Sequence, residues 1–186
     1  MSQETMEWLN NNTLIGMTDQ RSHAWHYQEC YQGEEPNHYD GPIPVGDLKR
    51  RLFNWEPIKS QAAALVPLAD DQLDMANVFD RHGNPIKDKK GNTVMMRISD
   101  RRVQIVRSDN FIDPGAFKDG YEPHGYNEWL VSVLSNILGD TLVISSAGLL
   151  QMGGQAWVEA SFPETMHDDM TGFDYRPYLL STTSLN

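Results

Sequence analysis

Short apolar segments with a period of two, separated by turn-forming residues, constrain the fold of this chain more than any other feature. In residues 155–162 the side chains of Ala156, Val158, Ala160 and Phe162 alternate with polar or bulkier residues. Such alternation places one set of side chains on each face of a strand. The pattern predicts antiparallel strands that bury one face and leave the other in contact with water.

Other regions repeat this pattern around loops rich in Gly, Asn and Pro, which favour turns. In residues 101–107, for example, Val103 and Ile105 alternate with arginine and glutamine. The predicted strands form an antiparallel meander of residues 75–81, 93–98 and 101–107. An extended segment at residues 55–66 precedes it, a hairpin of residues 142–150 and 156–162 follows it, and residues 176–181 form a last strand.

Two segments have the spacing of helices instead. The longer covers residues 126–138, and its apolar stripe consists of Trp129, Leu130, Val133, Leu134 and Ile137. Gly139 follows at the position where helices commonly end. Leu48, Leu52 and Phe53 predict a shorter helix, which would turn the three neighbouring cations toward solvent.

The predicted order of elements is β-β-β-α followed by a β-hairpin and a further strand. This is an α+β fold with a largely antiparallel sheet. Residues 1–43 contain many Gly, Pro, Asn and aromatic residues without periodicity, so we expect a long irregular N-terminal segment. Residues 44–186 are expected to form a single domain, truncated at its C-terminus because the chain stops directly after an apolar strand. We find no internal repeats.

The 186-residue chain carries a net charge of −11, which argues against a protein that coats DNA with its whole surface. Twelve of the fifteen Lys and Arg residues nevertheless lie between residues 48 and 107, where the local net charge is +5. Salt screens charges beyond about 8–10 Å, so a local basic face can still attract a polyanion. The alternative is that this segment is an ordinary solvated surface that balances the acidic segments.

A site for single-stranded nucleic acid needs cations for phosphates and flat side chains for bases. The predicted phosphate contacts are Lys49, Arg50, Arg51, Lys59, Arg97, Arg101, Arg102 and Arg107, and the predicted stacking residues are Phe53 and Trp55. On a regular strand Arg102 faces away from Arg101 and Arg107. The arginines therefore share one face only where the strand is bulged or frayed.

Two clusters suggest metal ligands. His23, His26, Cys30 and His38 supply nitrogen and sulfur, which suit zinc, although their spacing is not a standard zinc pattern. Their alternative role is packing within the loop. Carboxylates in residues 164–174, near His167, suit Mg²⁺, but no phosphate-binding or nucleophile motif accompanies them. These carboxylates are Glu164, Asp168, Asp169 and Asp174.

Four segments resemble the phage/plasmid-like protein family of actinobacterial phages and other mobile elements, a family of unknown function. They are residues 21–57, residues 102–111 (RVQIVRSDNF), residues 147–163 (AGLLQMGGQAWVEASFP) and residues 174–186. The resemblance implies a protein of the bacterial cytoplasm and a longer chain. The β-β-β-α order is also similar to the core of single-strand annealing recombinases, which form rings and need no nucleotide cofactor.

Three functions stay open. The first is binding of single-stranded DNA by a self-associating phage protein of DNA recombination and annealing, without a cofactor. The second is a protein–protein interaction module, such as a host-takeover or assembly factor, that uses acidic faces against a basic partner. The third is a metal-dependent enzyme. The chain lacks the ~20-residue apolar run of a membrane span and a signal peptide, so we expect no membrane partner.

Overall fold

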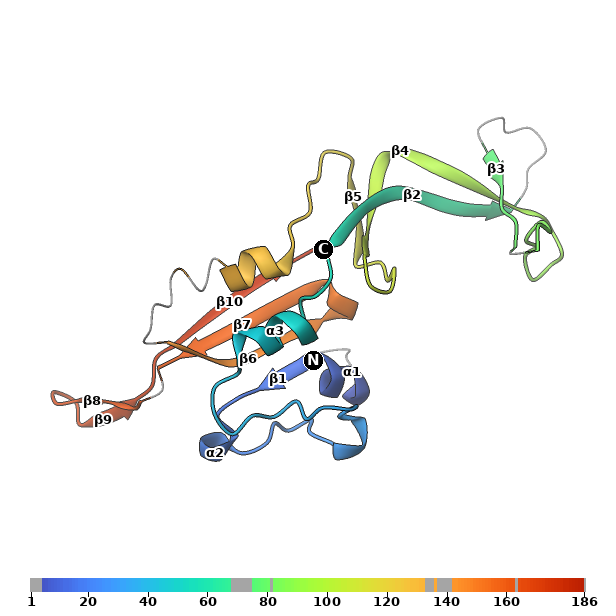
Figure 1. The fold of residues 1–186 in the computed structure, drawn as a ribbon. Helices are drawn as coiled ribbons and strands as arrows, with labels where there is room; N and C mark the ends of the chain where they lie inside the picture. The colour runs from blue at the N-terminus through green and yellow to red at the C-terminus, as the bar shows by residue number, and fades with distance from the viewer. Residues whose placement is uncertain are drawn as a thin grey trace.

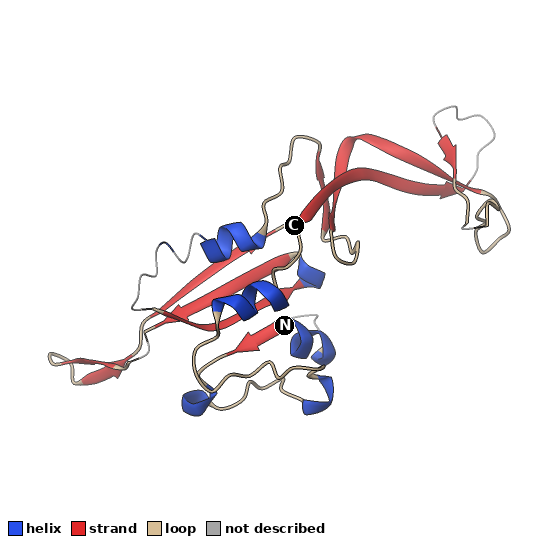
Figure 2. Ribbon diagram, in the orientation of Figure 1, coloured by secondary structure: helices blue, strands red, loops and turns tan. Residues whose placement is uncertain are grey.

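The computed structural model describes residues 5–67, 75–80, 82–132, 136, 142–162 and 164–185. These residues form an α+β fold built on antiparallel sheets, which confirms the predicted class (Figures 1 and 2). The main sheet has four strands in the order β1-β6-β7-β10. Their bounds are Thr13–Ile15 for β1, Val143–Leu150 for β6, Gln155–Ser161 for β7 and Tyr178–Ser184 for β10.

The core lies between one face of this sheet and the helices that cover it. Ala156, Val158 and Ala160 alternate toward this face and are fully or almost fully buried, as the period of two predicts. The covering helix α3 (Val45–Arg51) buries Leu48, and the residues after it bury Leu52 and Phe53. Each such side chain contributes roughly 1.5–3 kcal/mol to folding by leaving water.

The hairpin of β6 and β7 turns through the short helix η3 (Gln151–Gly153). Three consecutive residues in this turn, Gln151, Met152 and Gly153, have positive φ angles of 52°, 55° and 96°. The antiparallel pairing of β6 with β7 confirms the predicted hairpin. The last strand is confirmed as well, but it begins at Tyr178 because Pro177 stands before it.

The N-terminal segment is irregular over most of residues 22–43, but it contains short regular elements, one of which joins the main sheet. Strand β1 pairs with β6 at the edge of the main sheet, and its Leu14 is fully buried. The segment also contains α1 (Met6–Asn12), α2 (Thr18–Arg21) and the short helix η1 (Glu29–Tyr31). Periodicity could not reveal these elements because each is a turn or two of helix or a three-residue strand.

A long β arm projects from the body (Figure 1). It consists of β2 (Pro57–Pro67), β3 (Met75–Asn77), β4 (Val94–Arg107) and the loops of residues 78–93. At the base of the arm, β5 (Gly115–Lys118) pairs with β4. Strand β4 is the central strand and pairs antiparallel with both β2 and β3.

The predicted meander is therefore wrong in one respect, because residues 93–98 and 101–107 do not form two strands. They belong to one continuous strand, and β2 is its main partner. Between the two predicted strands, β4 has a bulge: Gln61 pairs with Val103 and Ala63 with Ile98, so Ala62 alone faces residues 99–102. A bulge of this kind bends and twists a strand without ending it.

Two consecutive turns at the tip of the arm have the same construction, which corrects the expectation of no internal repeats. The motif Asp-x-x-Gly-Asn occurs at residues 80–84 and again at residues 88–92. Asp80 accepts hydrogen bonds from the backbone N–H groups of His82 and Asn84 at 2.8 and 2.9 Å, and Asp88 does the same one turn later. Gly83 and Gly91, with φ of 82° and 87°, supply the left-handed residue that each turn needs.

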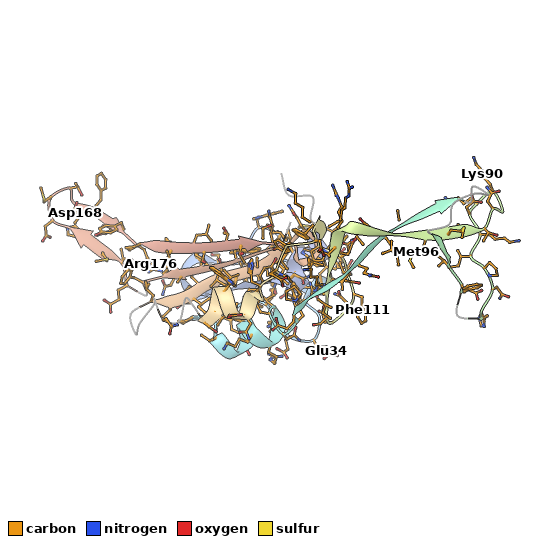
Figure 3. All side chains as sticks on the ribbon, turned by 90° about the horizontal axis from the view of Figure 1, so that it is seen from above. Glu34, Lys90, Met96, Phe111, Asp168 and Arg176 are labelled. Carbon is orange, nitrogen blue, oxygen red and sulfur yellow. The ribbon has the colours of Figure 1, made fainter. Side chains whose placement is uncertain are left out.

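The acidic segment near the C-terminus forms a second projection (Figure 1). Strands β8 (Met166–Asp168) and β9 (Phe173–Tyr175) pair as a small hairpin directly before β10. Figure 3 shows Asp168 of this hairpin and Lys90 of the arm at opposite ends of the molecule.

The predicted long helix is described only over its first part, as the π-helical turn η2 (Asn127–Ser132). Leu130 is buried as predicted, but Val131 is buried in place of Trp129, which is more than half exposed. A π-helix has more residues per turn than an α-helix, so the buried face moves along the sequence. Val133, Leu134, Ile137 and Gly139 lie outside the described residues.

The close approach of Trp157 to Gly148 generates a prediction about stability. A Cβ atom added at Gly148 would overlap the Trp157 ring. We expect Gly148→Ala to lower the free energy of unfolding by about 1–3 kcal/mol, the usual effect of overpacking. Gly46→Ala in α3 is the matched control, because nothing lies within 4 Å of its added Cβ. Urea denaturation measures both, and equal effects would contradict this packing.

Candidate nucleic-acid interface

The cations of α3 do not form a bare basic face. Lys49 is exposed, but Arg50 donates to both carboxylate oxygens of Glu35, at 2.7 and 2.6 Å, and to Asp47 at 3.2 Å. The hydrogen bonds from Arg50 lower the pKa of both the Glu35 and the Asp47 carboxyl groups. Arg50 is therefore occupied within the chain.

Arg51 faces the N-terminal segment, which corrects the expectation that it points to solvent. Its guanidinium donates to the carbonyl oxygen of Pro36 at 2.7 Å and to the Tyr39 hydroxyl at 3.0 Å. It also lies 3.8 Å from a carboxylate oxygen of Glu35. Arg51 thus anchors the loop before α3 and leaves little of its charge for a ligand.

Phe53 and Trp55 are not available for stacking on bases. Their exposed fractions are 2% and 3%, and both pack edge-on against the ring of Tyr126. The Trp55 indole N–H donates to the carbonyl oxygen of Leu52 at 3.0 Å. Sequence alone could not exclude them as stacking residues, because aromatic residues serve equally well in cores and in binding sites.

Arg107 is buried where the arm meets the body, with an exposed fraction of 6%. It forms two hydrogen bonds to the Asp109 carboxylate, at 3.0 and 2.6 Å, and its guanidinium carbon lies 4.4 Å from the centre of a Trp55 ring. These bonds lower the pKa of the Asp109 carboxyl group. Lys59, on β2, is similarly paired with Glu122 at 3.1 Å. Because both are already paired with carboxylates, neither Arg107 nor Lys59 is available to contact a phosphate.

Arg101 and Arg102 remain exposed, and both lie in the bulge of β4. Arg102 is directly opposite Lys118 of β5. Directly opposite residues share one face of a sheet, and two like charges there destabilise the pair. The sequence analysis missed Lys118, whose distance from the basic segment hid its position. The side chain of Arg97 lies outside the described residues.

The tip of the arm carries further exposed cations. Lys87, Lys89 and Lys90 surround the second Asp-x-x-Gly-Asn turn, with Phe79 and Ile86 also exposed beside them. Among the side chains that the structure describes, the Lys and Arg residues without a hydrogen bond or ion pair to the protein are Lys49, Lys87, Lys89, Lys90, Arg101, Arg102 and Lys118. All but Lys49 lie on the arm or on β5.

Two residues of the predicted zinc cluster, His23 and His38, lie close together in the structure, but their rings pack against neighbouring side chains. The rings of His23 and His38 lie 4.8 Å apart, and Tyr27 packs on both. The Nε2 atom of His38 accepts from the backbone N–H of Ala24, and its Nδ1 lies 2.5 Å from the Asn37 side-chain oxygen. Cys30 is exposed. Within the described ranges, no three His, Cys, Asp or Glu residues are placed to hold a metal ion.

The acidic hairpin likewise uses its carboxylates internally. Asp168 accepts from the Thr171 hydroxyl at 2.6 Å and from the Met170 backbone N–H, which lowers its pKa. Asp174 pairs with His167 at 2.7 Å. A cavity of about 350 Å³ lies nearby, between α2 and β10. Its two arginines, Arg21 and Arg176, already donate to Glu159 and Gln20.

Comparisons of the chain with protein-family models, with curated proteins and with solved structures found no match. In the part of the chain that the structure describes, no helix has the length and apolar character needed to cross a bilayer. The candidate site therefore stands on its own geometry.

Two histidines of the N-terminal segment, buried His26 and partly buried His38, generate a prediction about pH. Burial, together with the charges of His23, His26 and Arg21, lowers the pKa of His38 to about 4, and burial also lowers that of His26. The unfolded chain then binds more protons below pH 6.5, so stability should fall as the pH drops from 6.5 toward 4. The free energy of unfolding, measured across this range, should decrease steadily.

The variant His26→Phe identifies the source of that dependence. Neither ring nitrogen of His26 has a hydrogen-bond partner, so Phe should fit without losing one. We expect the variant to be at least as stable as the parent at pH 7 and to lose less stability on acidification. An unchanged pH dependence would show that His26 does not contribute.

The burial of Arg107 generates a separate prediction. Arg107→Gln leaves Asp109 without its partner and removes the stack on Trp55. We expect the free energy of unfolding to fall by about 3 kcal/mol, the lower end for a broken buried pair, because Asp109 is partly exposed. The matched variant Arg101→Gln, at an exposed position, should change stability little. Thermal and urea unfolding measure both.

Proposed function

We propose that this protein binds single-stranded DNA along its β arm, as a binding protein without catalytic chemistry of its own. The observation that carries the proposal is the placement of the unpaired cations. The six that lie from the tip of the arm to its base are Lys87, Lys89, Lys90, Arg101, Arg102 and Lys118.

An anionic ligand accounts for charges that are otherwise costly to the protein. Arg102 and Lys118 repel each other across neighbouring strands, and a phosphate between them would convert that repulsion into attraction. The net charge of the whole chain is −11, so the body repels the same ligand. A polyanion is therefore directed to the arm, where local charge dominates within a Debye length.

Exposed flat and apolar side chains favour a single strand over a duplex. Phe79 at the tip of the arm is 52% exposed, and Ile86 and Ile98 are exposed along it. Unpaired bases can stack on or pack against such side chains, whereas the bases of a duplex are already stacked on one another. This arrangement replaces Phe53 and Trp55 of the sequence-based site with Phe79.

The proposal agrees with the resemblance to proteins of phages and mobile elements, in which handling of single strands during recombination is a common need. A setting in the bacterial cytoplasm belongs to the same proposal.

Salt-dependent binding tests the proposal. Fluorescence anisotropy of a labelled single-stranded oligonucleotide should give an affinity that falls with salt. The logarithmic slope should be about −4 if all six cations contact phosphates, since each contributes about 0.7 on a single strand. A duplex of the same length should bind more weakly.

Two single-charge variants locate the site. Arg102→Gln should reduce the slope by about 0.7 and weaken binding, while it slightly stabilises the fold by ending the repulsion from Lys118. Lys49→Gln removes an exposed charge from the body and should leave binding unchanged. No binding at low salt, or equal losses in the two variants, would overturn the proposal.

A further inference from the structure

The cavity between α2 and β10 lies on the face of the main sheet opposite the core. Ser161 of β7 and Tyr178 of β10 both line this cavity of about 350 Å³. They are directly opposite each other in the sheet, so they share one face, and Ala160 beside them is buried on the other. The remaining walls come from α2, from the first half of β6 and from the β8–β9 hairpin. Five separate elements thus enclose one small space.

A buried hydroxyl in the wall of the cavity favours a polar occupant. The exposed fraction of Ser161 is 1%, and its hydroxyl has no hydrogen-bond partner among the protein groups that the structure describes. Buried polar side chains normally have at least one partner, so each exception calls for an explanation. A polar ligand in the cavity is such an explanation.

One of the two arginines that line the cavity is already neutralised. Arg21 donates through Nε to the Gly16 carbonyl at 2.9 Å and through a second nitrogen to the Glu159 carboxylate at 3.3 Å. Its third nitrogen donates to the Ser145 carbonyl, and the Ser145 hydroxyl donates to Glu159 at 2.7 Å. Arg21 and Glu159 therefore form a fixed wall whose charges balance.

The other arginine keeps its charge. Arg176 follows β9 at the foot of the hairpin (Figure 3), and it donates to the side-chain oxygen of Gln20 at 2.6 Å and to the Thr165 hydroxyl at 3.4 Å. Both acceptors are uncharged. Of the carboxylates that the structure describes, none forms an ion pair with Arg176, although Asp174 lines the same cavity. A guanidinium has five N–H donors, so Arg176 can still bind an anion.

The charges around the cavity favour a carboxylate over a phosphate as that anion. Of its two arginines, Arg176 alone is uncompensated, and Asp174 adds a negative charge whose contact with His167 at 2.7 Å involves one of its two oxygens. A phosphate with two negative charges would therefore meet one available cation and one carboxylate. A single carboxylate group matches the flat guanidinium both in charge and in shape.

Opposite charges that line one cavity without pairing suit a ligand that carries both charges. Such a ligand would place its carboxylate at Arg176 and an ammonium group at Asp174. Tyr175 and Tyr178 line the same cavity and are 48% and 55% exposed. Their rings offer flat apolar surfaces to a side chain, and the face of such a ring also attracts an ammonium group.

We propose that this cavity binds a free α-amino acid with an aromatic or large apolar side chain. The carboxylate of the amino acid binds Arg176, its ammonium group binds Asp174, and its side chain packs on the two tyrosines. The volume of the cavity is close to the lower limit of about 300 Å³ for small-molecule sites, which suits a ligand of this size. The site shares no residue with the arm and does not depend on the binding of DNA.

Isothermal titration calorimetry of the full chain without nucleic acid tests the class of ligand. The probes are free L-phenylalanine, L-tyrosine, L-leucine and L-methionine, of which at least one should bind as one molecule per chain. Its N-acetyl derivative lacks the ammonium charge and its amide lacks the carboxylate. Each should bind about tenfold more weakly or worse, because each loses a hydrogen bond between charged groups. No binding by any of the four, equal binding of the derivatives, or tighter binding of inorganic phosphate would overturn the proposal.

Two variants test the role of each charged side chain. Arg176→Gln should weaken binding about tenfold or more, whereas Arg101→Gln, on the arm, should leave it unchanged. Asp174→Asn should bind the free amino acid and its N-acetyl derivative nearly alike, because the ammonium group no longer meets a carboxylate. The Asp174 side chain is 70% exposed, so this variant should fold even if Arg176→Gln does not. Unchanged affinity in folded Arg176→Gln, or an unchanged preference in Asp174→Asn, would overturn the proposal, whatever the protein's affinity for DNA.

Discussion

The position of the arm depends on the buried stack of the Arg107 guanidinium on the Trp55 ring. Trp55 lies directly before β2 and Arg107 is the last residue of β4, so this contact fixes both long strands at their base. Tyr126 packs on Trp55 at 5.3 Å and donates its hydroxyl to the Gly153 carbonyl in the turn between β6 and β7. One cluster thus links the arm to the helical turn η2 and to the main sheet.

The distribution of ion pairs follows from the number of layers around each cation. In the body, Arg50 and Arg51 meet carboxylates and carbonyls supplied by the loop that packs against α3. The arm is a ribbon without a second layer. Apart from Lys59 and Arg107, its cations whose side chains are described therefore have no carboxylate partner (Figure 3). An acidic chain can therefore carry an exposed basic ribbon, because the pairing of charges is a local matter.

Local pattern alone was sufficient for the β6–β7 hairpin, the burial of Ala156 and Val158, and the α+β class, because period-two alternation depends only on neighbours in the chain. It was not sufficient for the site. Phe53, Trp55 and Arg107 look like ligands of nucleic acid in sequence, and the fold buries them together; Lys118 and Phe79 gain their place from strand register and from projection of the arm. Sequence determined which residues can form strands and where the cations are concentrated along the chain. Only the tertiary structure decided which charges meet a carboxylate and which aromatic residues are buried, since both depend on contacts between segments distant in the chain.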